Sequence, residues 1–226
     1  MGEAGADGSL STNATRVETA LMAAVASPQS TTLLTAAVDS ARDLVASLNR
    51  IAGEAATLRT EADAQITRQV STVNENLRRI DQINSKIQNL ELQGVDTLSL
   101  KDERGLLIDG ISSIIPVRAV NRDGGQVAVY TQNGAALLDG TIWELSFASA
   151  PTTVTYDMTA ANGALGGLKQ DQRAHSGLVD IPTGTGNGPM DGGSLSALFQ
   201  IRDGMVPGFT AEVDALVELL GDAHGD

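Results

Sequence analysis

The most regular pattern of hydrophobic and polar positions lies between Pro28 and Pro116, where apolar residues recur at alternating spacings of four and three. Such a heptad pattern is typical of a helix that packs lengthwise along other helices. It predicts one helix from Pro28 to about Leu92, capped by Ser27 at its start and by Gly94 at its end. At 1.5 Å per residue this helix is roughly 95–100 Å long. The apolar positions of this seam are Ala37, Ala41, Leu44, Leu48, Ile51, Ala55, Leu58, Ala62, Ile66, Val70, Val73, Leu77, Ile80, Ile83 and Ile87.

Shorter helices are predicted on both sides of the long one. Residues 13–26 repeat apolar positions every four residues, and residues 99–115 form a further helix. Helical spacing returns at residues 194–201, is interrupted or kinked at residues 205–208, and resumes at residues 210–220. One face of this last segment carries Val213, Val217 and Leu220. We therefore expect the returning helices to pack along the long helix.

Between these helical segments the pattern changes to short runs that predict strands. The segments 117–120 and 126–130 flank Asn-Arg-Asp-Gly-Gly, a sequence with the chemistry of a hairpin turn. Residues 142–147 and 152–156 have the same strand-like character. Residues 162–193 are rich in glycine and are predicted to be mostly loop.

The chain is therefore predicted to be an α+β protein that is mainly helical. We expect an elongated antiparallel helical bundle, built on the long helix, with a small β-rich lobe inserted into it. The predicted domains are a helical rod formed by residues 1–115 and 190–226, and a β-rich lobe with its glycine-rich loop at residues 116–189. Aromatic residues begin only at Tyr130, so the helices before it must pack through Leu, Ile, Val and Ala.

Charge and cysteine content exclude several kinds of partner and site. The net charge is −13, and the 15 Lys and Arg residues are scattered, with Arg78-Arg79 as the only adjacent pair. Nucleic-acid binding needs clustered cations and an anionic membrane repels such a chain, so we expect neither nucleic acid nor membrane as a partner. The lack of cysteine excludes disulfides, thiolate metal sites and a cysteine nucleophile.

A search of the sequence for chemistry predicts no catalytic, cofactor-binding or metal site. His175 and His224 are the only histidines, and neither lies in a cluster with ligand spacing. Asp171 and Asp180 are too isolated for a calcium loop. The segment 184–188, Gly-Thr-Gly-Asn-Gly, could cradle a phosphate, but no Lys-Ser/Thr follows it. The chain is therefore predicted not to be an enzyme and to need no cofactor.

Four groups of residues, in a fixed order, carry a resemblance to a known family. The most extended is residues 73–87, which fit a recurrent Val-Asn-x5-Ile-x-x-Leu-Asn-x-x-Ile pattern. The others are Ala26–Ser30 with Leu44–Asn49, Leu100–Arg104 with Leu107–Asp109 and Val117–Val120, and Gly192–Leu198 with Arg202-Asp203. Together they resemble the flagellar hook-associated protein 1 family, the first junction protein between hook and filament. Gly105 departs from the family, which usually has an acidic residue there.

The resemblance implies a structural component of the bacterial flagellum that acts through protein–protein contacts. It implies export unfolded through the flagellar secretion channel to an extracellular position. The implied partners are the hook protein, the next hook–filament junction protein and, when the protein is full-length, further copies in a ring. Family members carry terminal helical segments that this sequence lacks, so we expect a central fragment. Because copies with a charge of −13 repel, the chain alone is expected to be monomeric or weakly associated in dilute solution.

Two other interpretations compete with this one. A different surface or phage-tail structural protein could combine a helical stalk with a β-rich head in the same way. An enzyme with an unrecognised site in the glycine-rich segment is the second alternative, and it would have to place that site within residues 162–193.

Overall fold

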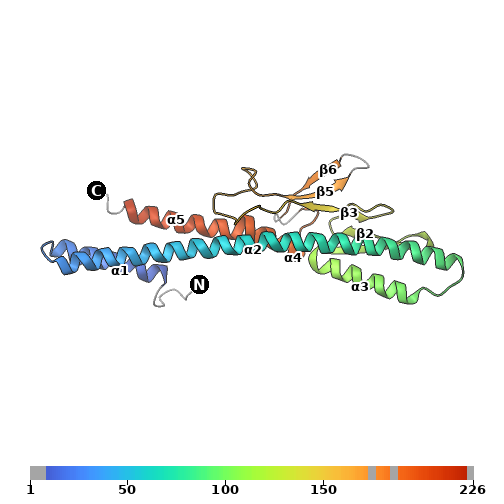
Figure 1. Ribbon diagram of the computed structural model, residues 1–226, viewed down its shortest axis with the longest axis horizontal. Helices are drawn as coiled ribbons and strands as arrows, with labels where there is room; N and C mark the ends of the chain where they lie inside the picture. Colours follow the sequence, from blue (N-terminus) through green and yellow to red (C-terminus); the bar gives the residue numbers. More distant parts are fainter. Residues whose placement is uncertain (1–8, 173–176, 184–187, 223–226) are drawn as a thin grey trace. The chain divides into compact units, whose positions relative to one another are not determined.

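The computed structural model describes residues 9–172, 177–183 and 188–222 (Figure 1). Toward the C-terminus, the side chains of residues 216–217 and 219–222 are outside that description. The chain forms two compact units, residues 1–56 and residues 57–226. The fold is mainly helical α+β, with one long helix and two small antiparallel sheets, as the sequence predicts. The division into a helical rod and a β-rich lobe at residues 116–189 stays a prediction.

The first unit is a helical hairpin made of α1 (Leu10–Ala26) and the first part of α2 (Thr31–Leu92). Helix α1 begins three residues earlier than predicted, because the Ser9 hydroxyl accepts a hydrogen bond from the Thr12 N–H at 3.2 Å and caps the helix. A polar contact holds the two helices together, since the Asn13 amide donates to the Ser47 hydroxyl at 2.7 Å. Ala24 and Ala37 are also buried, and side chains of this size allow two helices to approach closely.

The start of α2 differs from the prediction, whereas its end does not. Ser27 still closes α1, because its N–H donates to Ala24, and the next residues form a turn. Helix α2 therefore starts at Thr31, and the Ser30 hydroxyl accepts from the Leu33 N–H. At the other end, Gly94 has a φ of +72°, and the Val95 N–H reaches back to Leu90, which is the expected glycine cap.

The second unit packs its helices around the second part of α2. All predicted seam positions from Ile66 to Ile87 are buried, so the periodic pattern is confirmed over this stretch. The first part of the seam is less regular, because Ala41 and Leu58 are exposed. The other helical elements of this unit are α3 (Leu98–Ile114), α4 (Gly193–Gln200), the π-helical turn η2 (Ile201–Met205) and α5 (Val206–Asp222).

The returning helices join this core through α4. Leu195, Leu198 and Phe199 are buried in the same apolar cluster as Ile66 and Val70 of α2. Of the predicted contact face on α5, Val213 is half-buried, whereas the side chains of Val217 and Leu220 lie outside the described residues. An interruption at residues 205–208 is wrong, because helical structure continues through this segment, and the irregularity is a π-helical turn that ends at Met205. Pro207 sits in the first turn of α5, where a missing N–H costs little.

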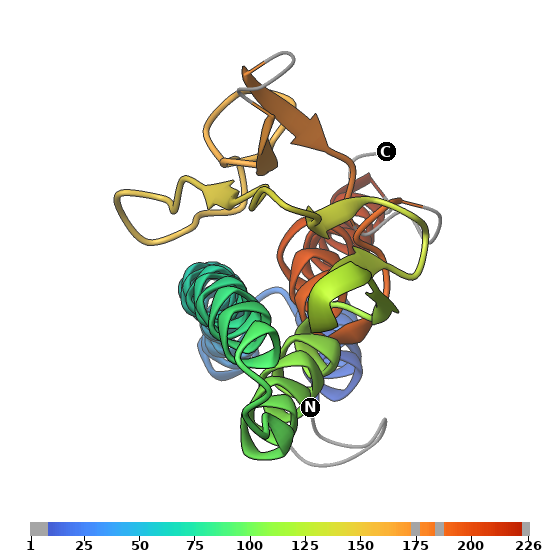
Figure 2. The same ribbon diagram turned by 90° about the vertical axis from the view of Figure 1, so that its right-hand side faces the viewer.

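Both sheets lie along one side of the second part of α2, and α3 lies on the other side (Figures 1 and 2). In each sheet the three strands follow chain order and are antiparallel. The 3-10 turn η1 (Asp123–Gly125) joins the first two strands. The strands are β1 (Val117–Asn121), β2 (Val127–Thr131) and β3 (Ala136–Leu138), then β4 (Leu145–Phe147), β5 (Leu168–Gln172) and β6 (Gly177–Ile181).

The predicted β segments are partly correct. The hairpin of β1 and β2 is confirmed, and of residues 142–147 only the last three form a strand. The strand predicted at residues 152–156 is wrong, because this segment has no strand partner. The loop predicted at residues 162–193 is also wrong in part, since it contains β5 and β6. In β5, the alternation of buried Leu168, exposed Lys169 and buried Gln170 marks a strand that is covered on one face.

We predict that Leu77→Asp or Ile80→Asp strongly destabilises the second unit. Both side chains are fully buried in the apolar cluster, and a charge placed there without a partner costs several kcal/mol. Arg68→Asp is the control, because this position is exposed on the same helix and surface changes stay within about 0.5 kcal/mol. Urea unfolding followed by circular dichroism measures both. Equal urea midpoints for the seam variants and for the Arg68 control would show that the apolar seam is not the buried face of the helix.

Candidate functional site

Among the described residues, the most extensive polar geometry is the attachment of the two sheets to α2. At one point the Asn74 amide is buried against β4. Its Nδ2 donates to the Leu145 carbonyl at 2.7 Å, and its Oδ1 accepts from the Leu145 N–H at 2.9 Å. The side chain thus bonds both polar groups of one strand residue, as a neighbouring strand would. It therefore supplies hydrogen-bond partners to the Leu145 backbone on the open edge of β4.

Ten residues further along α2, Asn84 repeats this arrangement on β2. Its Nδ2 donates to the Val127 carbonyl at 2.8 Å, and its Oδ1 accepts from the Val127 N–H at 3.1 Å. The same Oδ1 also accepts from Arg104 of α3, whose Nη1 bonds the Gly125 carbonyl as well. Burial lowers the pKa of Arg104, and the charge of Glu91 opposes this effect. One buried amide therefore joins α2, α3 and the first hairpin.

The tip of this hairpin lies very close to α2. Gly125 has a φ of +70°, a conformation that favours glycine. A Cβ atom on Gly125 would meet the Glu91 carboxylate at 2.5 Å. Glu91 itself is held by Lys101 at 2.8 Å, and this hydrogen bond lowers the pKa of Glu91. The turn therefore favours glycine here, and a larger residue would also have to displace the end of the Glu91 side chain.

A third attachment holds residues 148–167, which we call the strap, to the start of the second unit. The Asp63 carboxylate accepts from the Ala150 N–H, and the Thr60 hydroxyl accepts from the Val154 N–H, both at 2.9 Å. The buried Arg59 donates to the carbonyls of Thr155 and Met158 at 2.6 Å each. These bonds occupy the strap's backbone, which explains why residues 152–156 form no strand.

Arg202 of the π-helical turn completes this cluster and is fully buried. Its Nη1 lies 2.7 Å from Asp63, and its Nε and Nη2 donate to the two carboxylate oxygens of Asp203. The central carbon of its guanidinium group lies 5.2 Å from the centroid of the Phe147 ring and 5.0 Å from the centroid of the Phe199 ring. Burial opposes the charged form, but the bonds to Asp203 and Asp63 outweigh it, so the pKa of Arg202 is raised. A buried ion needs such complete pairing.

Three of the side chains of α2 that accept hydrogen bonds from the sheets and the strap share one position in the sequence pattern. Asp63, Asn74 and Asn84 each directly follow a buried seam residue, namely Ala62, Val73 and Ile83. One residue turns a helix by about 100°, so these side chains lie on the same flank of the seam. We call them the polar flank of α2. Both asparagines belong to the family pattern at residues 73–87, but their role in holding the sheets was not predicted. A polar residue that recurs directly after a seam position is the feature of the sequence that could have indicated it.

A polar cleft of about 660 Å³ lies between α2 and the first hairpin. At its edge, Arg122 donates two hydrogen bonds to Asp139, and the Tyr130 hydroxyl donates a third. The bonds from Arg122, and then that from Tyr130, hold the pKa of Asp139 below its usual value. This carboxylate is committed to structural contacts and is a poor general base.

The residues considered for chemistry in the sequence do not converge. Asp180 of β6 pairs with Lys169 at 3.3 Å, and Asp171 lies on β5. Both histidines, His175 and His224, lie outside the described residues, as do residues 184–187. Within the described part of the chain, no three His, Asp or Glu side chains are grouped so as to hold a metal ion. No helix there is both long and apolar enough to cross a membrane.

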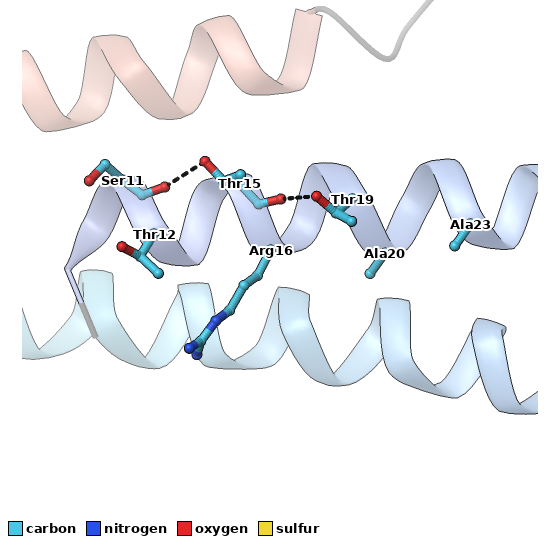
Figure 3. A pocket seen from close by; sticks show the side chains of 7 residues that line it. All are labelled: Ser11, Thr12, Thr15, Arg16, Thr19, Ala20 and Ala23. Carbon is cyan, nitrogen blue, oxygen red and sulfur yellow. Dashed lines mark hydrogen bonds between the residues drawn. The ribbon is translucent and has the colours of Figure 1, made fainter. Parts of the chain in front are cut away.

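A second hollow, of about 540 Å³, runs along one face of α1 (Figure 3). Its hydroxyl groups are used within the helix, since Thr15 donates to the Ser11 carbonyl and Thr19 donates to the Thr15 carbonyl. The other side chains that line it are Thr12, Arg16, Ala20 and Ala23. Apart from Arg16, the hollow is lined by small side chains.

These features define a class of protein: a mainly helical scaffold whose long helix holds small sheets through side-chain-to-backbone hydrogen bonds. The sequence profile of the flagellar hook-associated protein FlgK helical domain matches residues 1–224. The chain belongs to this family.

Comparison with solved structures supports the same fold. The flagellar hook junction protein FlgK from Burkholderia pseudomallei matches with a TM-score of 0.68 and 19% sequence identity. The match covers 85% of this chain and 33% of that chain, so this chain spans about a third of that protein's length. No curated protein sequence matches the chain.

We predict that Asn74→Ala lowers the free energy of unfolding by about 2–4 kcal/mol, because both backbone groups of Leu145 lose their buried partner. Asn89→Ala is the matched control, since Asn89 is exposed on the same helix. Hydrogen exchange gives a local check. The Leu145 amide should exchange faster in the variant, and the Val127 amide should not. Equal protection of Leu145 in both variants would contradict the role of this amide.

The stability that Asp139 contributes is predicted to depend on pH. Its pKa is lower in the folded chain than in the unfolded chain, where it is near 4. The contribution is therefore complete above about pH 4 and is lost as the pH falls through the lower, folded value. Thermal melts of the chain and of Asp139→Asn should differ at pH 7 and converge at low pH. A difference that stays constant with pH would exclude this linkage.

Proposed function

We propose that the protein is a structural component of the bacterial flagellum that joins hook and filament through protein–protein contacts. The observation that carries this proposal is the family match over residues 1–224. The buried polar flank adds to it, because Asn74 and Asn84 hold the sheets in a fixed register on a helical scaffold. Rigid placement of surfaces is what an assembling subunit needs, and it uses no catalytic group.

The partners follow from this role. They are the hook protein on one side, the next hook–filament junction protein on the other, and further copies of the protein in a ring. The protein acts outside the cell after export through the flagellar secretion channel in an unfolded state. The cysteine-free sequence suits that route, since a chain without disulfides can be threaded and refolded.

A hook-binding assay tests the proposal. We expect the chain, inserted in place of the helical domain of the Burkholderia pseudomallei FlgK, to co-sediment with purified hooks. The chain alone should bind hooks more weakly. The matched control is the same chimera with Leu77→Asp, which disrupts the core of the second unit and should stay in the supernatant. A chimera that has full helical circular dichroism and still fails to bind hooks would count against a junction role.

A further inference from the structure

The second sheet has one closed edge and one open edge. Among the described residues, β6 pairs with β5 alone, and it lies farther from α2 than β5 does (Figure 1). At the opposite end of this sheet, Asn74 bonds both backbone groups of Leu145 and so closes the edge of β4. Within the part of the chain that the structure describes, the outer edge of β6 has no such partner.

The hydrogen-bond pattern of β5 determines which backbone groups of β6 point outward. The Asp171 N–H donates to the Glu144 carbonyl at 2.8 Å, so the backbone of Asp171 faces β4. Backbone groups alternate in direction along an antiparallel strand, so Lys169 faces β4 as well. Asp171 lies opposite Leu178 and Lys169 lies opposite Asp180, and the residues of such pairs do not bond each other. The N–H and C=O groups of Leu178 and Asp180 therefore point away from β5.

The side chains of β6 suit this edge to pairing with another strand. The strand contains neither lysine nor proline, and its register with β5 has no bulge, so it lacks three features by which proteins discourage pairing at an edge. Leu178 is 55% exposed, and the side chain of Asp180 is 82% exposed. Since they are two residues apart, both lie on the same face of the sheet. On β1, at the edge of the other sheet, the apolar Val117 and Val120 are instead half-buried.

The charge of the second unit favours a basic occupant that is not a second copy. Residues 57–226 carry 12 basic and 22 acidic side chains, a net charge of −10. Asp180 lies 3.3 Å from Lys169, but an exposed ion pair of this kind is weak and leaves the carboxylate accessible to another cation. A second copy would bring the same acidic unit to this edge and be repelled. A basic segment would be attracted.

We propose that the outer edge of β6 binds an extended, basic segment of another protein, which adds a fourth strand to the sheet. The outward backbone groups of Leu178 and Asp180 bond the backbone of the segment, and these bonds supply affinity without regard to sequence. Specificity comes from the outer face of the sheet. There the segment places an apolar residue beside Leu178 and, two positions away, a lysine or arginine beside Asp180. This binding goes beyond the proposed function and does not depend on it.

A labelled peptide tests the charge preference of the edge. The probe is a fluorescent, threonine-rich peptide that carries leucine and lysine two positions apart, and anisotropy follows its binding to the whole chain. Replacing the lysine of the probe by glutamate should weaken binding by about fivefold, because like charges then lie on adjacent strands. Asp180→Lys should reverse this preference. Asp109→Lys is the matched control, since it changes the net charge equally at an exposed position of α3 and should leave the preference unchanged.

Proline tests the backbone bonds separately from the charge. Asp180→Pro removes an outward N–H and sets its ring against the incoming strand, but it removes no bond to β5. It should weaken binding by at least about fivefold relative to Asp180→Ala, which loses the charge alone. Ala119→Pro is the matched control, because Ala119 is exposed and its N–H points outward from β1 in the same way. It should bind the probe normally, and circular dichroism verifies that each variant folds.

Hydrogen exchange locates the bound probe. The amides of Leu178 and Asp180 should exchange more slowly when the probe is bound, whereas the Val179 amide, which already faces β5, should not change. A chain that does not bind the probe overturns the proposal, as does equal binding by Asp180→Pro and Asp180→Ala or equal weakening by Ala119→Pro. Amides of Leu178 and Asp180 that are as slow as that of Val179 without the probe also overturn it, because the edge is then already covered.

Discussion

Buried backbone N–H and C=O groups need hydrogen-bond partners, and at the edge of a small sheet neighbouring strands do not supply enough of them. The second unit meets this constraint with side chains of a helix. Asn74 bonds both polar groups of Leu145, and Asn84 does the same for Val127. An amide is suited to this because it offers one acceptor and two donors at the spacing of a peptide group. Without these two side chains, each sheet would face α2 with unpaired backbone.

The attachments are spaced along one helix, and this spacing fixes the positions of the strap and of both sheets. Asp63, Asn74 and Asn84 are separated by 11 and 10 residues, or about 15–17 Å along the axis. The strap, β4 and β2 are bonded in that order, so the register of α2 sets the position of all three. The buried Arg202 reinforces the first attachment, because it bonds Asp63 and the strap carbonyl of Gly166 together. A shift of α2 by one residue would break every one of these bonds.

The elements that the sequence predicts well are those whose determinants are local or periodic. The seam from Ile66 to Ile87, the cap at Gly94 and the first hairpin belong to this group. The attachments could not be predicted, because Asn74 and Leu145 are 71 residues apart and Arg59 and Arg202 are 143 apart. The wrong strand prediction at residues 152–156 has the same cause. Threonine, valine and tyrosine favour strands there, but side chains of α2 take up the backbone groups that a strand partner would need.

The two parts of α2 solve different packing problems with the same heptad period. In the second part, the apolar seam is buried, and the side chains of the polar flank are hydrogen-bonded to the backbone of the strap and the strands. Both of these faces of the helix are therefore covered. In the first part, the residues buried on α2 are the small Ala37 and Ala55, Leu44, Leu48 and Ile51 are half-buried, and Val38 and Val45 are exposed by about half. A helical hairpin with so few large buried side chains is stabilised weakly by its own contacts.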